Sequence, residues 1–289
     1  GYEEPTSIQE RCIPVLLQTS KDLVGQAQTG TGKTAAFGLP ILDLLDEKKP
    51  AVQALILTPT RELAIQVAEE INTLRGKRRT KVAPIYGGQS FGLQLKKIKQ
   101  GVQIVVGTPG RVLDHLDRKT LRLDDLSVFV LDEADEMLNM GFIEDVEKII
   151  SFAPQKRRML MFSATMPRLI LALAKKYMQD YELIQIKKEQ LTVDLTEQIY
   201  FEVRESDKLE ALCRIIDMEP DFFGLVFCRT KVDVDQVCQK LLDRGYEAES
   251  IHGDISQDKR EKIFNRFRQQ KFNILVAIRQ GDLWSGGAV

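Results

Sequence analysis

The protein has 289 residues, of which 43% are hydrophobic and 29% charged, and its formal net charge is −1. This composition excludes a disordered or low-complexity chain, and no apolar run reaches the roughly 18 residues of a membrane-spanning helix. A net charge so close to zero also excludes a uniformly basic surface, so a nucleic-acid partner would have to bind to local patches.

The length predicts two domains, each large enough to bury a core of its own. The first residues, GYEEPTSIQERC, lack the basic and apolar regions of a secretion signal, so we expect a cytoplasmic protein. The four cysteines show no metal-ligand spacing, and we expect reduced thiols that lie mostly in the core.

Short apolar runs alternate with stretches of helical periodicity, and many of the runs end in a polar or glycine-containing turn. Continuous apolar runs are typical of strands covered on both faces, which predicts an α/β fold with a parallel sheet between helices. Ligands bind at the carboxyl ends of the strands in such sheets. The five runs with polar tails span residues 22–30, 51–60, 102–110, 128–135 and 158–165.

A further apolar run ends near Ile186, and the polar residues 188–196 predict a linker between a first domain, 1–187, and a second domain, 197–289. A new alternation in the second domain predicts a second α/β unit. Its strand-like runs span residues 224–230, 248–254 and 272–277, and its helical stretches span 231–245 and 256–270.

The stretch AQTGTGKT, residues 27–34, matches the phosphate-binding pattern GxxxxGK[ST] except at its first position. Glycines let the backbone N–H groups of such a loop converge on phosphates, and the following helix directs its positive end toward them. Lys33 would reach the β- and γ-phosphates, and Thr34 would ligate Mg²⁺. The alternative is a flexible strand-to-helix turn. The nucleotide-binding residues predicted here are Ala27, Thr29, Gly30, Thr31, Gly32, Lys33 and Thr34.

The stretch VFVLDEAD, residues 128–135, places carboxylates directly after an apolar run. A nucleoside triphosphatase needs one carboxylate to hold Mg²⁺ and another group to orient the attacking water. Asp132 suits the first role and Glu133 the second, so Lys33, Asp132 and Glu133 are the predicted catalytic residues. The alternative, an acidic helix N-terminus, suits Asp135 and Glu136 better than it suits these two.

These motifs, in this order, resemble the DEAD-box RNA helicase family, whose name is spelled at residues 132–135. The resemblance extends from Gly1 to about Ala277. It implies two RecA-like domains with parallel sheets flanked by helices, the second of them truncated. It also implies ATP and Mg²⁺ as cofactors and RNA as the partner. Binding through phosphates and 2′-hydroxyls would be independent of sequence and selective for RNA.

The opening GYEEPTSIQ resembles the family's Q motif, in which Gln9 would hydrogen-bond the adenine edge. An amide near a helix start would explain Gln9 alone. Residues 163–165, SAT, resemble the motif that couples the ATP state to unwinding, which assigns Ser163 and Thr165 this role. The alternative is that both hydroxyls cap a strand end.

Three segments of the first domain resemble the family's contacts with the RNA backbone: PTRELA at 59–64, the pair Gly87 and Gly88, and TPGR at 108–111. Arg61 and Arg111 would otherwise be ordinary surface or ion-pair residues. The basic run 75–81 is interpreted as a solvated turn that adds non-specific attraction. The RNA-binding residues implied are Pro59, Thr60, Arg61, Gly88, Thr108, Pro109, Gly110 and Arg111, with Arg229 from the second domain.

Elsewhere in the second domain, Gln257 and Arg260 resemble a family pair that shares one helix face. His252 either reaches toward ATP upon closure or packs in a turn, and the sequence leaves both alternatives open.

The resemblance ends after Ala277, because residues 278–289 contain neither a Thr-Asp and Ala-Arg-Gly stretch nor a His-Arg-Ile-Gly-Arg-like motif. In the family the latter supplies arginine fingers, which are worth roughly 10³- to 10⁵-fold in rate. We therefore expect this chain to bind ATP but to hydrolyse it poorly. Two other hypotheses are a non-catalytic, ATP-regulated RNA clamp and a related DNA-directed motor.

Overall fold

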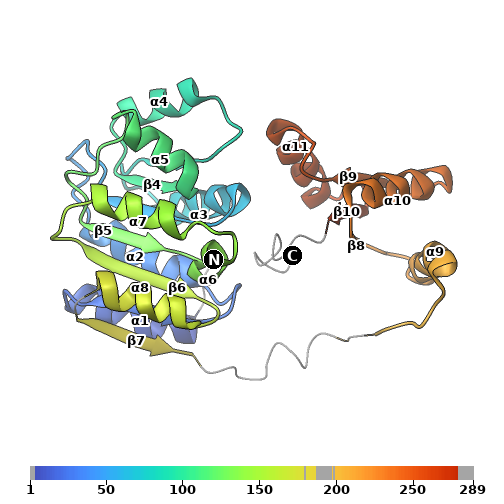
Figure 1. Cartoon of the computed structure of the whole chain (residues 1–289), viewed down its shortest axis with the longest axis horizontal. Coiled ribbons are helices and arrows are strands. Elements are labelled where there is room, and N and C mark those ends of the chain that lie inside the picture. Colours follow the sequence, from blue (N-terminus) through green and yellow to red (C-terminus); the bar gives the residue numbers. More distant parts are fainter. Residues whose placement is uncertain (1–3, 179, 187–196, 198, 279–289) are drawn as a thin grey trace. The chain divides into compact units, whose positions relative to one another are not determined.

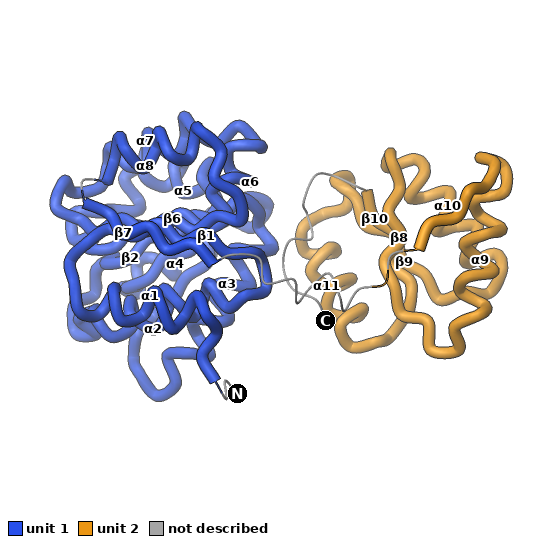
Figure 2. Tube along the Cα trace, turned by 90° about the horizontal axis from the view of Figure 1, so that it is seen from below, with its two compact units in different colours: residues 1–188, 284–289 blue, residues 189–283 orange. Residues whose placement is uncertain are grey.

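The computed structural model describes residues 4–178, 180–186, 197 and 199–278. The chain divides into two compact units, unit 1 containing Gly1–Lys188 and unit 2 containing Glu189–Leu283 (Figure 2). The predicted linker, 188–196, and the tail, 279–289, lie outside the described residues, so the proposed domain boundary stays a prediction.

A parallel sheet forms the centre of unit 1, and its strands lie in the order β3-β4-β2-β5-β6-β1-β7 (Figure 1). All residues of β2, β4 and β5 are buried, which is the burial expected when helices cover both faces. The predicted parallel α/β fold is confirmed. The strands are β1 Asp22–Gln26, β2 Ala54–Leu57, β3 Val82–Ile85, β4 Ile104–Gly107, β5 Val128–Leu131, β6 Arg158–Ser163 and β7 Tyr181–Gln185.

Helices cover both faces of this sheet, with α1 and α2 on one side and α7 and α8 on the other (Figure 2). Each face has its own hydrophobic cluster; Phe37 and Phe162 lie in one, and Phe129 and Ile149 in the other. The helices are α1 Ser7–Gln18, α2 Lys33–Leu44, α3 Arg61–Leu74, α4 Phe91–Lys99, α5 Pro109–Asp117, α6 Ala134–Asn139, α7 Ile143–Phe152 and α8 Arg168–Tyr177.

The strand register determines which loops meet. Strand β6 lies between β1 and β5, with Leu160 beside Leu23 on one side and Met161 beside Leu131 on the other. Because all three strands are parallel, their carboxyl ends meet at one edge of the sheet. The loops that follow β1, β5 and β6 are the phosphate-loop, DEAD and SAT segments, so the predicted convergence of polar tails is confirmed.

Glycine at position 25 explains how β1 fits into this sheet. A Cβ atom there would lie 2.7 Å from the Phe162 ring, and that ring packs on Phe37 with centroids 5.2 Å apart. A larger residue in the middle of β1 would displace this aromatic pair, which anchors β6 against α2.

Unit 2 contains a smaller parallel sheet in the order β8-β10-β9, which confirms the predicted second α/β unit. The sequence analysis missed α9, which precedes the first strand. The elements are the 3₁₀ helix η2 Glu205–Asp207, α9 Lys208–Met218, β8 Gly224–Cys228, α10 Lys231–Asp243, β9 Ala248–Ile251, α11 Gln257–Arg268 and β10 Ile274–Ile278.

Two expectations from composition are met in the described part of the chain. None of its helices is long and apolar enough to cross a membrane. The four cysteines are free, and Cys12, Cys213 and Cys238 are buried. Burial raises the pKa of Cys12 to about 12, so this thiol stays protonated and unreactive.

Candidate functional site

The phosphate loop occupies residues 27–32, between β1 and α2. Two of its glycines, Gly30 and Gly32, have left-handed backbone angles, with φ of 79° and 84°. Gly32 directly precedes α2, so the loop presents the N-terminus of a 12-residue helix. This is the conformation that aims backbone N–H groups and the positive helix end at an anion.

The start of α1 braces this loop. Thr6 donates from Oγ1 to the carbonyl oxygen of Thr31 at 2.8 Å, and Gln9 donates from Nε2 to that of Gly32 at 3.1 Å. Gln9 is only 3% exposed, and its Oε1 accepts from the Thr6 backbone N–H at 3.0 Å. The adenine contact of Gln9 stays a prediction, whereas its contact with the loop is observed. Thr6 was missed by sequence reasoning.

Lys33 and Asp132 are the buried charged pair of the site, and both lie at the same edge of the sheet. Lys33 is 6% exposed, and no described residue hydrogen-bonds its Nζ. Burial raises the pKa of Asp132, while the nearby positive charge of Lys33 acts against that rise. An unpartnered buried amine is costly, which is the property expected of a group that binds an anionic ligand.

Glu133 lies in a strained conformation at the N-terminus of α6. Its φ of 51° is in the left-handed region, which is unusual for a residue with a long side chain. Glu133 is 6% exposed, and Thr29 of the phosphate loop donates to its carboxylate at 3.4 Å. The strain therefore brings the predicted water-orienting carboxylate against the loop that would hold the phosphates.

Asp135 links the DEAD segment to the SAT segment. Its carboxylate accepts from the Thr165 backbone N–H at 2.9 Å and from Thr165 Oγ1 at 2.7 Å, and its own N–H donates to Ser163 Oγ at 3.2 Å. Burial acts to raise the pKa of Asp135, but these hydrogen bonds outweigh it and lower the pKa. Asp135 lies in the first turn of α6, as the sequence predicts, and its link to Thr165 is an additional contact that the sequence does not indicate.

The residues expected to hold Mg²⁺ are Thr34, at the start of α2, and Asp132, just after β5. No group of three or more His, Cys, Asp or Glu side chains forms a ready-made metal cage within the described residues. Mg²⁺ is usually held by one or two protein oxygens together with phosphates and waters. The Asp132 carboxylate and the half-buried Thr34 hydroxyl fit that pattern.

The expected RNA-binding segments of unit 1 begin at the ends of β2, β3 and β4, which are also adjacent and parallel. Thr60 caps α3 and accepts from the Leu63 N–H at 3.2 Å, while Pro59 before it is buried. Arg61 lies against Gly87, where a Cβ atom would be 3.3 Å from Arg61 Nη2.

The TPGR segment follows β4. Thr108 is the N-cap of α5 and Pro109 its first residue, an arrangement that suits the fixed φ of proline, and Gly110 is exposed. Arg111 donates from Nη1 to the carbonyl oxygen of Gln89 at 2.9 Å, next to Gly88. Arg111 of the TPGR segment is therefore hydrogen-bonded to the residue that follows the Gly87 and Gly88 pair.

The predicted residues of unit 2 are described within that unit alone. Arg229 is exposed just after β8. Arg260 donates to Gln257 Oε1 at 3.4 Å, which agrees with their expected shared helix face. His252 lies 3.1 Å from the Asp235 carboxylate with its side chain 9% exposed. His252 thus contacts helix α10 within unit 2, and a contact with ATP stays a prediction.

Comparisons with known proteins agree with these motifs. Residues 6–173 match the model of the DEAD/DEAH box helicase family, and residues 207–282 match that of the helicase conserved C-terminal domain. The chain is 52% identical over 277 residues to the probable ATP-dependent RNA helicase MJ0669 of Methanocaldococcus jannaschii. It is 50% identical, over the same length, to the DEAD-box ATP-dependent RNA helicase CshA of Geobacillus kaustophilus.

Each match covers 96% of this chain, but only 74% of the archaeal protein and 59% of CshA. Among solved structures, a DEAD box protein from the hyperthermophile Methanococcus jannaschii has a TM-score of 0.63 at 51% identity, and 75% of it is covered. Saccharomyces cerevisiae Dbp5 bound to RNA and ADP BeF3 has a TM-score of 0.85 at 30% identity, and 71% of it is covered. Both structural matches cover 96% of this chain. With the loop, DEAD and SAT segments at one sheet edge, these matches show that the chain belongs to the DEAD-box family of RNA helicases.

Proposed function

We propose that the chain binds ATP with Mg²⁺ at the edge formed by β1, β6 and β5, and that its activity is the RNA-stimulated hydrolysis of ATP coupled to local RNA unwinding. The observation that carries this proposal is the Lys33 amine, which is buried and has no described partner in a loop shaped for phosphates. The names of its relatives, ATP-dependent RNA helicases, support the same activity.

We assign a separate role in ATP binding or hydrolysis to each of the described site residues. Lys33 and the N–H groups of the loop would hold the phosphates, while Gln9 would select adenine. Thr34 and Asp132 would hold Mg²⁺, which when bound neutralises charge on the phosphate oxygens. Glu133 would orient the attacking water, since it is the carboxylate in contact with the loop. Through Thr165 and Ser163, Asp135 would transmit the nucleotide state to the segment after β6.

RNA would bind at the segments after β2, β3 and β4 of unit 1, with Arg229 contributing from unit 2. Backbone N–H groups, threonine hydroxyls and arginines contact phosphates and sugars without identifying bases. We therefore propose binding that is independent of sequence and that distinguishes RNA from DNA through the 2′-hydroxyl. Competition between RNA and DNA oligonucleotides of equal sequence tests this, and equal affinities would contradict it. A cytoplasmic location is part of the proposal and is tested by cell fractionation.

For the 289 residues taken by themselves we propose ATP binding with slow turnover. They contain no His-Arg-Ile-Gly-Arg-like motif, and the arginines of that motif lower the barrier by roughly 4 to 7 kcal/mol. The same observation favours a second candidate, an RNA clamp regulated by ATP binding alone. RNA-stimulated release of phosphate separates the candidates: slow but measurable stimulation supports the enzyme, whereas ATP-dependent RNA binding without any turnover supports the clamp.

Lys33→Met provides the direct test of the nucleotide site. Removing the buried amine relieves its desolvation penalty but also takes a positive charge away from Asp132, so the free energy of unfolding should change by less than about 2 kcal/mol. The same change should abolish measurable binding of a fluorescent ATP analogue. Lys21→Met, at an exposed position before β1, serves as the control and should retain ATP binding. Unchanged ATP affinity in Lys33→Met would refute the proposed site.

A further inference from the structure

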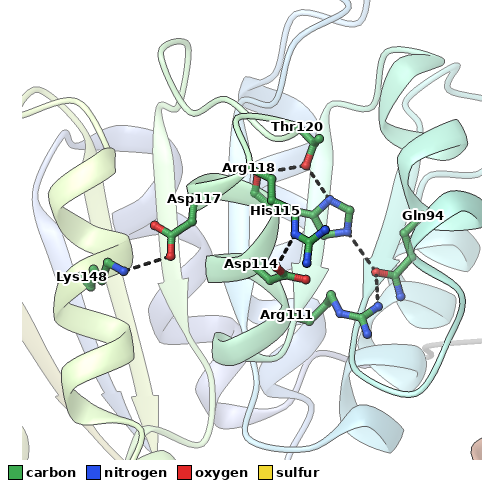
Figure 3. Close-up of polar contacts among 8 residues, drawn as sticks. All are labelled: Gln94, Arg111, Asp114, His115, Asp117, Arg118, Thr120 and Lys148. Atoms are coloured by element: carbon green, nitrogen blue, oxygen red, sulfur yellow. Dashed lines mark hydrogen bonds and ion pairs between the residues drawn. The ribbon is translucent and has the colours of Figure 1, made fainter.

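Two of the expected RNA-contact segments are connected through one buried side chain, Gln94 of α4. Gln94 is 0% exposed although it is polar. It faces the loop 86–90 on one side and helix α5 on the other, where Arg111 and His115 lie four residues apart on one face (Figure 3).

Both the nitrogen and the oxygen of the Gln94 side-chain amide make hydrogen bonds. Its Nε2 donates to the carbonyl oxygen of Tyr86 at 2.7 Å and to Gln89 Oε1 at 3.3 Å. Its Oε1 accepts from Arg111 Nη1 at 3.1 Å and lies 3.2 Å from His115 Nε2. A carbonyl oxygen on one side and a guanidinium on the other allow only this orientation of the amide.

His115 keeps the amide in place. Its ring is 0% exposed, stacks on Phe91 with centroids 4.0 Å apart, and places Nδ1 2.9 Å from Thr120 Oγ1. Burial, with the charges of Arg111 and Arg118, lowers the pKa of His115 to about 4, so the ring is neutral at neutral pH. Gln94 Oε1 can only accept, so a ring proton on Nε2 points at the amide, and the Thr120 hydroxyl then donates to Nδ1 in place of the His115 carbonyl oxygen.

The guanidinium of Arg111 is held through one of its nitrogens, Nη1. This atom donates to the carbonyl oxygen of Gln89 and to Gln94 Oε1, and the Arg111 residue is half-buried. This leaves Nη2 and Nε to donate to a phosphate oxygen. A guanidinium that is ordered before binding avoids the entropy cost of ordering a long side chain when RNA arrives.

We propose that Gln94 is a positioning residue for RNA binding, which joins Arg111 and the loop 86–90 into one preformed phosphate-contact surface, with His115 as the support that orients its amide. This inference rests on the proposed RNA-binding function. It assigns a role to two buried polar side chains that touch neither ATP nor RNA directly.

The test is a double-mutant cycle between Gln94→Met and Arg111→Ala. Methionine keeps the length of the side chain and removes both ends of the amide. The readout is the affinity for a fluorescein-labelled oligouridylate, measured by anisotropy with a non-hydrolysable ATP analogue and Mg²⁺. Gln94→Met should weaken RNA binding roughly 2- to 10-fold in the unchanged chain, the size expected from the cost of ordering one side chain. In the Arg111→Ala background it should have less than about a twofold effect, because the group it positions is gone.

Ile98→Ala is the matched control, since Ile98 lies on the same helix, packs against the core and has no polar side-chain atom that could hydrogen-bond to the network. It should lower the melting temperature while leaving RNA affinity unchanged below the melting transition. His115→Phe retains a ring to stack on Phe91 but cannot donate to Gln94, and it keeps the test informative if Gln94→Met fails to fold. It should reduce RNA affinity in the unchanged chain and have little effect in the Arg111→Ala background.

The outcomes separate this inference from the function on which it rests. An equal loss of affinity in both backgrounds, or no loss in either, would overturn the positioning role while RNA binding itself stood. If Arg111→Ala weakened binding and reduced its salt dependence by about one ion, but both support variants left affinity unchanged, the inference alone would fail. No RNA binding by the unchanged chain would overturn the proposed function and the inference together.

Discussion

At the scale of single residues, Gly32 illustrates how the phosphate loop depends on one missing side chain. Its φ of 84° is in the left-handed region, and a Cβ atom would lie 2.3 Å from Gln9 Nε2. The glycine therefore serves two needs, the turn into α2 and the close approach of Gln9. The Gly30 backbone is also left-handed, with φ of 79°, but a Cβ atom there would meet nothing within 4 Å.

Because a Cβ atom would meet Gln9 at position 32 but nothing at position 30, alanine variants at the two glycines should differ in stability. Gly30→Ala should cost only the backbone strain, about 1–2 kcal/mol of unfolding free energy. Gly32→Ala should cost about 1–3 kcal/mol more, because it also displaces Gln9 from its buried hydrogen bond, and it should weaken ATP binding. Urea unfolding and nucleotide titration measure both quantities. Equal losses of stability in the two variants would show that Gln9 does not brace the loop.

The residues proposed as catalytic could be singled out in the sequence because their spacing is local. Lys33 and Thr34 follow the glycines directly, and Asp132 and Glu133 follow one apolar run. In contrast, Gln94 is hydrogen-bonded to Arg111, 17 residues away, and lies within hydrogen-bonding distance of His115, 21 residues away. No periodic pattern in the sequence indicates that these side chains meet.

At the scale of elements, α6 and the end of β6 are joined through Asp135. The hydrogen bonds from Thr165 tie the first turn of that helix to the SAT segment. Since the folded protein has the lower pKa for this carboxylate, its contribution to stability is fully present above the pKa of the unfolded chain. That contribution is lost as the pH falls through the folded pKa.

Asp135→Asn should therefore destabilise the protein by about 1–2 kcal/mol at pH 7, the scale of hydrogen bonds to a charged group. The difference from the unchanged chain should shrink once the pH falls below about 4, where the carboxylate of the unfolded chain is protonated. Urea unfolding across this range measures it. Glu144→Gln, at an exposed position in the first turn of α7, should change stability little at any pH. A difference for Asp135→Asn that did not vary with pH would mean that packing, not charge, joins the two elements.

Strands were predicted well where the apolar run was continuous, as in β2, β4 and β5. Strand β3 has the same length but was missed, because Val82–Ile85 is only alternately buried, includes Pro84 and lies at the edge of the sheet. Proline is tolerated there since an edge strand does not need every backbone N–H. Helix α9 was missed although its amphipathic pattern resembles those that were found.

At the scale of the whole molecule, the two units have different amounts of core. The sheet of unit 1 has a hydrophobic cluster on each face, whereas the described residues of unit 2 show one cluster against a sheet of three strands. Stability increases with buried apolar area, so unit 2 should be the less stable of the two.

Calorimetry should therefore resolve two transitions, with unit 2 melting first. ATP analogue and Mg²⁺ at about 100 times the Kd should stabilise unit 1 by about 2.7 kcal/mol and raise the upper transition by roughly 5–10 °C, without moving the lower one. Lys33→Met should abolish the shift. A single cooperative melting transition, shifted to a higher temperature by ATP, would contradict the prediction that the two units unfold independently.

The fold class and the two α/β units could be predicted from the sequence, and candidate ATP-binding residues could be proposed, because all of these rest on local periodicity and on motifs of adjacent residues. The contacts of Gln9 with the loop, of Asp135 with Thr165 and of Gln94 with Arg111 became visible only in the folded chain. The two side chains or backbone groups in these contacts lie 23, 30 and 17 residues apart in the sequence. No local pattern links residues at such separations, so they become neighbours only when the helices and loops pack onto the sheet.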